Sequence, residues 1–153
     1  MKVKVLKLCD NASVPSKTYE TDFCYDCVAT SCEEIAPHVF KYGLGVAFQI
    51  ERDKGDVGAP LVLSIDVRPR SSIWKTGMIL SNGVGTVDEN YRGEVSAVLY
   101  HVMPNMPKYE VGDRIAQIKI GVAPNIEFEV ASALTDTDRG ARGYGSTDMK
   151  HES

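Results

Sequence analysis

The sequence predicts an all-β fold, either a barrel or a sandwich, built from short strands. Runs of apolar and β-branched residues recur along the chain, and each has the length of a strand. Turn-forming glycine, proline and aspartate residues separate these runs at intervals of about 8 to 15 residues, a spacing typical of all-β domains. Only residues 71–77 favour a short helical segment.

The expected strands follow one another with turns between them. Residues 3–8 alternate apolar and charged side chains, as a half-buried strand does, and the apolar run 61–67 ends at Pro69. Turns are expected at 41–43, 53–55, 104–107 and 111–113. The remaining strands are expected at residues 23–29, 44–50, 78–80, 95–102, 115–122 and 126–130.

Composition narrows the class of protein. The 153 residues suit one domain, and the hydrophobic fraction of 43% and charged fraction of 25% are those of a globular protein. A net charge of −4 without a basic stripe disfavours stable nucleic-acid binding. No apolar run approaches the ~20 residues of a membrane span, and the alternating start does not resemble a signal peptide. We therefore expect no membrane association and a cytoplasmic location, or a nuclear one in a eukaryote.

Four cysteines lie in the first quarter of the chain, at positions 9, 24, 27 and 32. The spacing of Cys24, Cys27 and Cys32 leaves open a metal site or a disulfide. There is a single CxxC, so reduced thiols packed around a strand are the favoured interpretation.

Two central segments carry side chains suited to binding phosphate and to accepting a proton from water. The guanidinium of Arg70 suits two phosphate oxygens, and Ser71 and Ser72 add hydroxyl donors, although the same residues also suit the start of a helical turn. A hairpin over residues 82–93 follows, with glycines that allow the backbone to approach a ligand. Within it, Asp88 is placed to deprotonate a water, or simply to stabilise the turn.

The chain changes character from about residue 135. The segment is rich in glycine, arginine and hydroxyl side chains, so it cannot bury a core. One interpretation is a disordered tail. The other is an arm that becomes ordered over a ligand, with its arginines on phosphates and Tyr144 as a stacking face.

Five segments in order resemble the motifs of the trimeric dUTP diphosphatase (dUTPase) family. They are spread over most of the length of the chain: Cys24-Tyr25-Asp26-Cys27-Val28-Ala29, Pro69-Arg70-Ser71-Ser72, residues 83–94, Gly112-Asp113-Arg114-Ile115-Ala116-Gln117 and residues 139–147. The third, Gly-Val-Gly-Thr-Val-Asp-Glu-Asn-Tyr-Arg-Gly-Glu, matches nearly residue for residue.

The resemblance implies a jelly-roll-type β-barrel over residues 1–134 and a glycine-rich arm over 135–153. It implies a homotrimer with shared active sites that hydrolyses dUTP to dUMP and diphosphate. This reaction limits uracil incorporation into DNA and supplies dUMP for dTMP synthesis. Asp88 is the implied catalytic base for attack of water on the α-phosphate.

The resemblance also assigns the binding residues. Uracil and deoxyribose would contact Asn82, Gly85, Val87, Tyr91 and Tyr144. The phosphates would contact Arg70, Ser71, Ser72, Gln117, Arg139, Gly145, Ser146 and Thr147. A Mg²⁺ ion held mainly by phosphates and water is implied as the cofactor, with Asp26 reaching it only through water.

Two alternatives stay open. A dCTP deaminase shares this fold, but the position of its catalytic glutamate, five residues after Gly93, is Val98 here. A catalytically weak nucleotide-binding regulator is the second alternative, and it is disfavoured because Asp88, Tyr91, Arg70 and Gln117 are all present.

Overall fold

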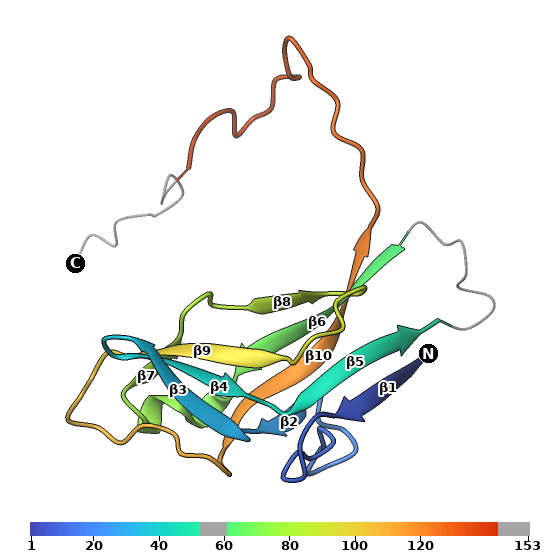
Figure 1. Ribbon diagram of the computed structural model, residues 1–153. Coiled ribbons are helices and arrows are strands. Elements are labelled where there is room, and N and C mark those ends of the chain that lie inside the picture. The colour runs from blue at the N-terminus through green and yellow to red at the C-terminus, as the bar shows by residue number, and fades with distance from the viewer. Residues whose placement is uncertain (53–60, 144–153) are drawn as a thin grey trace.

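A computed structural model describes residues 1–52 and 61–143, which form antiparallel sheets with a single short helical turn (Figure 1). Strand β1 (Lys2–Lys7) pairs with β5 (Val46–Glu51). A four-stranded sheet has the order β2 (Tyr25–Val28), β10 (Arg114–Pro124), β6 (Leu61–Pro69) and β8 (Gly85–Asp88). A second has the order β3 (Ser31–Ala36), β4 (Val39–Gly43), β9 (Ser96–His101) and β7 (Met78–Leu80). The all-β prediction is confirmed, and the expected helical segment is the 3-10 turn η1 (Ser71–Lys75).

Alternating burial along the strands explains why they form one core. In β6, Leu63, Ile65 and Val67 are buried, and the β10 residues opposite the last two are Ile120 and Ile118. The intervening β6 side chains are polar and form the other face of the sheet. This period of two places one apolar face of each strand toward the interior, where burial of apolar area stabilises the barrel.

The expected turn at residues 41–43 is wrong, because these residues end strand β4. Tyr42 is fully buried, lies opposite Ala97 of β9, and donates a hydrogen bond from Oη to the carbonyl of Tyr109 at 2.8 Å. Packing of this aromatic side chain therefore overrides the local turn signal of Gly43. Strand β3, which was not expected, pairs with β4 through a tight turn in which His38 has a φ of 62°.

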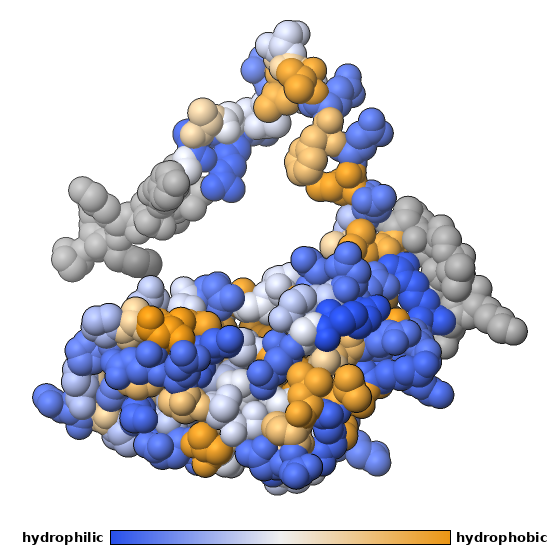
Figure 2. All heavy atoms as spheres, in the orientation of Figure 1, coloured by the Kyte–Doolittle hydropathy of each residue, from blue (hydrophilic) through white to orange (hydrophobic). Residues whose placement is uncertain are grey.

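The expected strand at 126–130 is also wrong, because this segment leaves the barrel and pairs with no sheet in the described part of the chain. Its alternating apolar side chains are almost fully exposed, with Phe128 at 90% and Val130 at 99%. Figure 1 shows the chain extending away from the barrel after β10, and Figure 2 shows apolar side chains on this extension. A strand needs a neighbour for its backbone groups, and this chain alone provides none here.

Among residues 1–52 and 61–143, no helix has the length and apolar character required to cross a membrane.

Candidate active site

The prediction of a hairpin over residues 82–93 is wrong in its pairing: this segment, called the hairpin segment below, is strand β8 with a loop on either side, and β8 pairs with β6 instead of with β7 or β9. Gly83 adopts a φ of 67° in the turn after β7, a conformation that favours glycine. Strand β8 pairs with β6, with Gly85 opposite Val67. A Cβ atom at position 85 would lie 3.3 Å from both Val67 Cβ and Asn82 Nδ2, so glycine permits this close approach. The backbone of β8 is thereby held against the body of the barrel.

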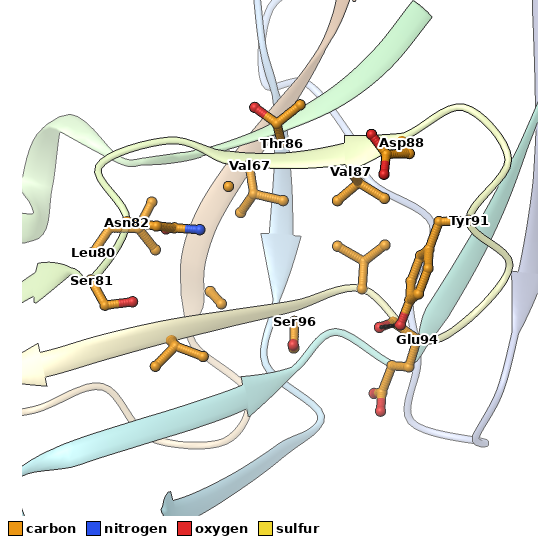
Figure 3. Close-up of a pocket in the computed structure, with 14 residues that line it drawn as sticks. Val67, Leu80, Ser81, Asn82, Thr86, Val87, Asp88, Tyr91, Glu94 and Ser96 are labelled. Atoms are coloured by element: carbon orange, nitrogen blue, oxygen red, sulfur yellow. Dashed lines mark hydrogen bonds between the residues drawn. The ribbon is translucent and has the colours of Figure 1, made fainter. Parts of the chain in front are cut away.

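A cavity of about 320 Å³ lies between this hairpin segment and strand β9. Asn82 points into it from one end, and Tyr91 and Asp88 lie at the other (Figure 3). Its walls combine apolar side chains with backbone, and the lining residues are Val67, Leu80, Ser81, Asn82, Gly85, Thr86, Val87, Asp88, Tyr91, Glu94, Val95, Ser96, Ala97 and Val98. Apolar walls with a few convergent polar groups are typical of a small-molecule site. The cavity brings together all the described residues predicted to contact base and sugar.

Tyr91 is held at the mouth of this cavity by the loop that follows it. A Cβ atom at Gly93 would lie 2.6 Å from Cζ of Tyr91, so the ring packs on the glycine backbone. Tyr91 Oη donates a hydrogen bond to the carbonyl of Glu94 at 3.2 Å. The ring remains 48% exposed, so one part of it is available to a ligand.

The acid groups of the cavity have different surroundings. Asp88 is exposed at the rim, whereas the Glu94 carboxylate accepts a hydrogen bond from the Gly45 amide at 2.8 Å. The cavity also includes Val98, at the position where a deaminase would need its glutamate. Asp88 is therefore the carboxylate best placed to act on a water there.

A second cavity, of about 340 Å³, contains the predicted phosphate-binding wall. Its lining residues are Ser16, Lys17, Thr18, Tyr19, Asp22, Phe23, Cys24, Asp26, Arg70, Ser71 and Gln117. Arg70 donates from Nε and Nη2 to the two carboxylate oxygens of Asp26, at 2.8 and 3.1 Å. Arg114 Nη1 also donates to Asp26, at 3.3 Å, and Gln117 Nε2 donates to the carbonyl of Pro69 at 2.8 Å.

Ser72 lies behind this wall, beside a buried tyrosine. Arg70 Nη1 lies 3.5 Å from Ser72 Oγ, at the long limit for a hydrogen bond. The Tyr109 hydroxyl is buried and has no hydrogen-bond partner among the described residues. Burial raises the pKa of Tyr109, while the neighbouring Ser72 hydroxyl and the Arg70 charge act in the opposite direction. The phenol therefore stays neutral at physiological pH.

Within one chain these two cavities are separate and share no lining residue. The structure thus brings Asp26, Arg70, Ser71 and Gln117 together, but it does not bring them to Asp88. Arg139 lies on the exposed extension, where its Nε donates to the carbonyl of Arg142 at 3.1 Å. The predicted ligands Tyr144, Gly145, Ser146 and Thr147 fall outside the described residues.

The cysteines and carboxylates bear on the predicted metal. Burial, followed by the charge of Asp26, raises the pKa of Cys27 to about 12, so its thiol is not a thiolate at neutral pH. In the part of the chain that the structure describes, no three His, Cys, Asp or Glu side chains gather as a metal cage. Asp26 fits a contact through water at Oδ1, which accepts from Arg70 Nε and keeps a further lone pair, whereas Oδ2 accepts from both Arg70 and Arg114.

Sequence reasoning missed several residues of this site. Lys17 lines the second cavity, Arg114 pairs with Asp26, and Tyr109 neighbours Ser72. No sequence pattern relates Lys17 or Tyr109 to Arg70, because these residues are far apart in the chain and only the folded structure brings them together. Arg114 lay within a recognised motif, and its partner required the structure.

Comparisons with known proteins give one family. The model of the dUTPase family matches residues 10–148. Deoxyuridine 5'-triphosphate nucleotidohydrolase of Picosynechococcus sp. is 32% identical over 151 residues, covering 96% of this chain and 99% of that protein. The protein of the same description from Corynebacterium glutamicum is 35% identical over 148 residues, covering 95% of this chain and 93% of its own length.

Solved structures give the same fold. A mutant dUTPase of Staphylococcus bacteriophage 80alpha, solved with dUpNHpp, matches with a TM-score of 0.77 at 19% identity, covering 95% of this chain and 98% of that chain. A mutant dUTPase from phage phi11 of S. aureus, described for its coordination of a structural Mg(II) ion, matches with a TM-score of 0.69 at 17% identity, covering 89% and 100%. The predicted jelly-roll-type barrel is confirmed.

Proposed function

This chain belongs to the dUTPase family, and from that premise we propose that it hydrolyses dUTP to dUMP and diphosphate. The observation that carries the proposal is the cavity formed by the hairpin segment, which gathers Asn82, Asp88 and Tyr91 around the backbone of β8. The products fit a role in limiting uracil incorporation into DNA and in supplying dUMP. The cytoplasmic location and the lack of stable nucleic-acid binding stay predictions.

Recognition of the base rests on the hairpin segment. Uracil presents an acceptor at O4 and a donor at N3, and cytosine presents the reverse order, so a fixed set of backbone groups distinguishes the two. Asn82 and the backbone from Gly85 to Val87 supply that set in our proposal. Tyr91 packs under the deoxyribose and leaves no room for a ribose 2′-hydroxyl.

Asp88 is the proposed general base. It is exposed at the rim of the cavity, where it can accept a proton from water while the water attacks the α-phosphorus. The bond from the α-phosphorus to the bridging oxygen then breaks, and diphosphate leaves. Arg70, Ser71, Ser72 and Gln117 hold the phosphate chain, and backbone and side-chain donors of this kind lower the energy of the charged transition state.

A complete site requires more than one chain, and we propose a homotrimer. The cavity at the hairpin segment and the phosphate wall are separate within one protomer, so one protomer's hairpin segment must meet another's wall. The exposed apolar side chains of the extension, Ile126, Phe128, Val130 and Leu134, support assembly because a monomer gains nothing by exposing them. The arm beyond them carries Arg139, Tyr144, Gly145, Ser146 and Thr147, which we assign to uracil stacking and the terminal phosphates.

A divalent metal accompanies the substrate in this proposal, and Mg²⁺ is the ion we propose. Asp26 would hold the ion through water, and the phosphates of the substrate would supply most of its oxygen ligands, as is common for Mg²⁺. The ion neutralises phosphate charge when bound.

The test is a substrate panel. The purified protein is incubated with Mg²⁺ and dUTP, dCTP, dTTP or UTP, and products are identified by chromatography and by diphosphate and ammonia assays. Diphosphate and dUMP from dUTP alone are expected. Ammonia from dCTP would instead establish the deaminase alternative, and tight dUTP binding without turnover would establish the regulator.

A further inference from the structure

Lys17 lines the cavity of the phosphate wall, although no motif assigns it a role. Two of the lining residues carry positive charge, Lys17 and Arg70, and two carry negative charge, Asp22 and Asp26. The formal charge of the lining is therefore zero with Lys17 and negative without it. Positive charge in a cavity attracts a polyphosphate, and Lys17 provides one of the two positive charges that this lining offers.

The segment around Lys17 is fixed on both sides. Ser16 and Asp26 exchange two backbone hydrogen bonds, at 3.2 and 2.7 Å, and Arg114 Nη1 donates to Thr18 Oγ1 at 3.4 Å. The Lys17 ammonium lies 4.5 Å from the centroid of the Tyr25 ring. A cation over an aromatic face is held by the ring quadrupole, and its remaining N–H groups stay available to a second partner.

Arg70, in contrast, is already engaged. Its Nε and Nη2 contact Asp26, and its Nη1 contacts Ser72 Oγ and the carbonyl of Arg114. Among the described residues, no ion pair involves Lys17. Lys17 is thus the cation of this cavity whose charge no carboxylate offsets at contact distance.

We propose that Lys17 Nζ binds the phosphate chain of the substrate beside Arg70, as an additional phosphate ligand. The proposal rests on the proposed function, because it concerns the triphosphate of dUTP. A lysine acts on phosphate as a point charge and donates charge-assisted hydrogen bonds, so it contributes chiefly to binding. Lys17 therefore affects KM more than kcat.

The test compares Lys17→Met and Lys17→Arg with the wild type. Lys108→Met is a matched control, because Lys108 also lies over an aromatic ring, 5.0 Å from the centroid of Phe40, and outside this cavity. We expect Lys17→Met to raise the Kd of inorganic diphosphate, measured by calorimetry at fixed Mg²⁺, and the KM for dUTP by about five- to tenfold. kcat should stay within about twofold, and the salt dependence of kcat/KM should become shallower. Lys17→Arg and Lys108→Met should both remain near the wild-type values.

Unchanged diphosphate affinity and KM in a folded Lys17→Met protein would overturn the assignment. A second measurement uses the wild type only: dUpNHpp should protect Lys17, but not Lys108, from mild acetylation mapped by mass spectrometry, and equal labelling with and without the analogue would contradict it. If the wild type fails to hydrolyse dUTP, the proposed function fails, whereas the effect of Lys17→Met on diphosphate binding still decides the role of Lys17.

Discussion

Arg52 Nε and Nη2 donate to the two carboxylate oxygens of Glu89, with the first distance 2.9 Å and the second 2.6 Å. Glu89 also accepts from the backbone amide of Leu63, and Arg52 Nη2 donates to the carbonyl of Leu61. This two-point contact ties the residue after Asp88 to the residue after β5, and the bonds of Glu89 to Leu63 and of Arg52 to Leu61 tie both side chains to β6. The pair therefore holds the proposed base in position relative to the barrel.

Glu89→Gln should lower both stability and activity. The amide removes one of two charge-assisted contacts, which we expect to cost about 1–2 kcal/mol of unfolding free energy, and the chain next to Asp88 loses a contact with the barrel. Thermal unfolding and steady-state kinetics with dUTP measure the two effects. Glu51→Gln is the control, because its pair with Lys4 is exposed and should contribute little. Equal effects from both variants would contradict the anchoring role.

Asp88→Asn should abolish turnover and retain binding. The amide preserves size but cannot take a proton, so kcat should fall by about 100-fold or more. The Kd for dUTP, measured by calorimetry, should change by less than about threefold. Near-wild-type release of diphosphate by this variant would show that Asp88 is not the base.

Acid should destabilise the protein through two carboxyl groups. The hydrogen bonds from Arg52 lower the pKa of Glu89. Burial opposes ionisation of Asp66, but hydrogen bonds from Lys119 and Ser64 outweigh it and lower the Asp66 pKa as well. The folded pKa values lie below the ordinary 3.8 for Asp and 4.5 for Glu. At pH values near and below these ordinary values, the unfolded state therefore binds more protons than the folded state.

The stabilisation that the Asp66 and Glu89 carboxylates provide is therefore complete at pH values above their unfolded pKa values. It is lost as the pH falls through their folded pKa values. The thermal unfolding midpoint, measured at a series of pH values from 6 to 3, should decrease once the pH is below about 4.5. The double variant Asp66→Asn, Glu89→Gln should have a lower unfolding midpoint than the wild type at pH 6, and its midpoint should change less between pH 6 and pH 3. An equally steep fall in the double variant would assign acid sensitivity to other groups.

Tyr109→Phe should leave the protein as stable or slightly more stable. The substitution removes a buried hydroxyl that lacks a partner among the described residues, so the unfolding free energy should rise by as much as about 1 kcal/mol. Tyr42→Phe is the contrasting variant, because it removes a buried donor from the carbonyl of Tyr109 and should cost about 1–2 kcal/mol. Thermal unfolding distinguishes them, and a marked loss in Tyr109→Phe would reveal a partner for its hydroxyl.

Two truncations should separate assembly from activity. A chain ending at residue 138 keeps the exposed apolar residues of the extension, so it should stay trimeric while losing most activity with the arm. A chain ending at Pro124 lacks Ile126, Phe128 and Val130 as well and should not assemble. Light scattering and dUTP turnover measure both properties. A monomeric 1–138 chain, or a trimeric 1–124 chain, would contradict this division.

The sequence by itself determined the elements whose signals are local. Runs of apolar and β-branched residues located β6 and β10, the short run 78–80 coincides with β7, and the glycine-rich run 83–94 contains β8 and its carboxylate. The order of the motifs along the chain was sufficient to predict the family, because each motif is a contiguous run of residues that can be read from the sequence.

Only the tertiary structure decided features that depend on residues far apart in the chain. Pairing with β9 makes residues 41–43 a strand, and the lack of a neighbouring strand leaves 126–130 extended and exposed. The Asp26–Arg70 and Arg52–Glu89 pairs, and the position of Lys17 beside Arg70, join side chains that no local pattern relates. Propensity and periodicity act over a few residues, whereas the choice of partner depends on how the sheets pack.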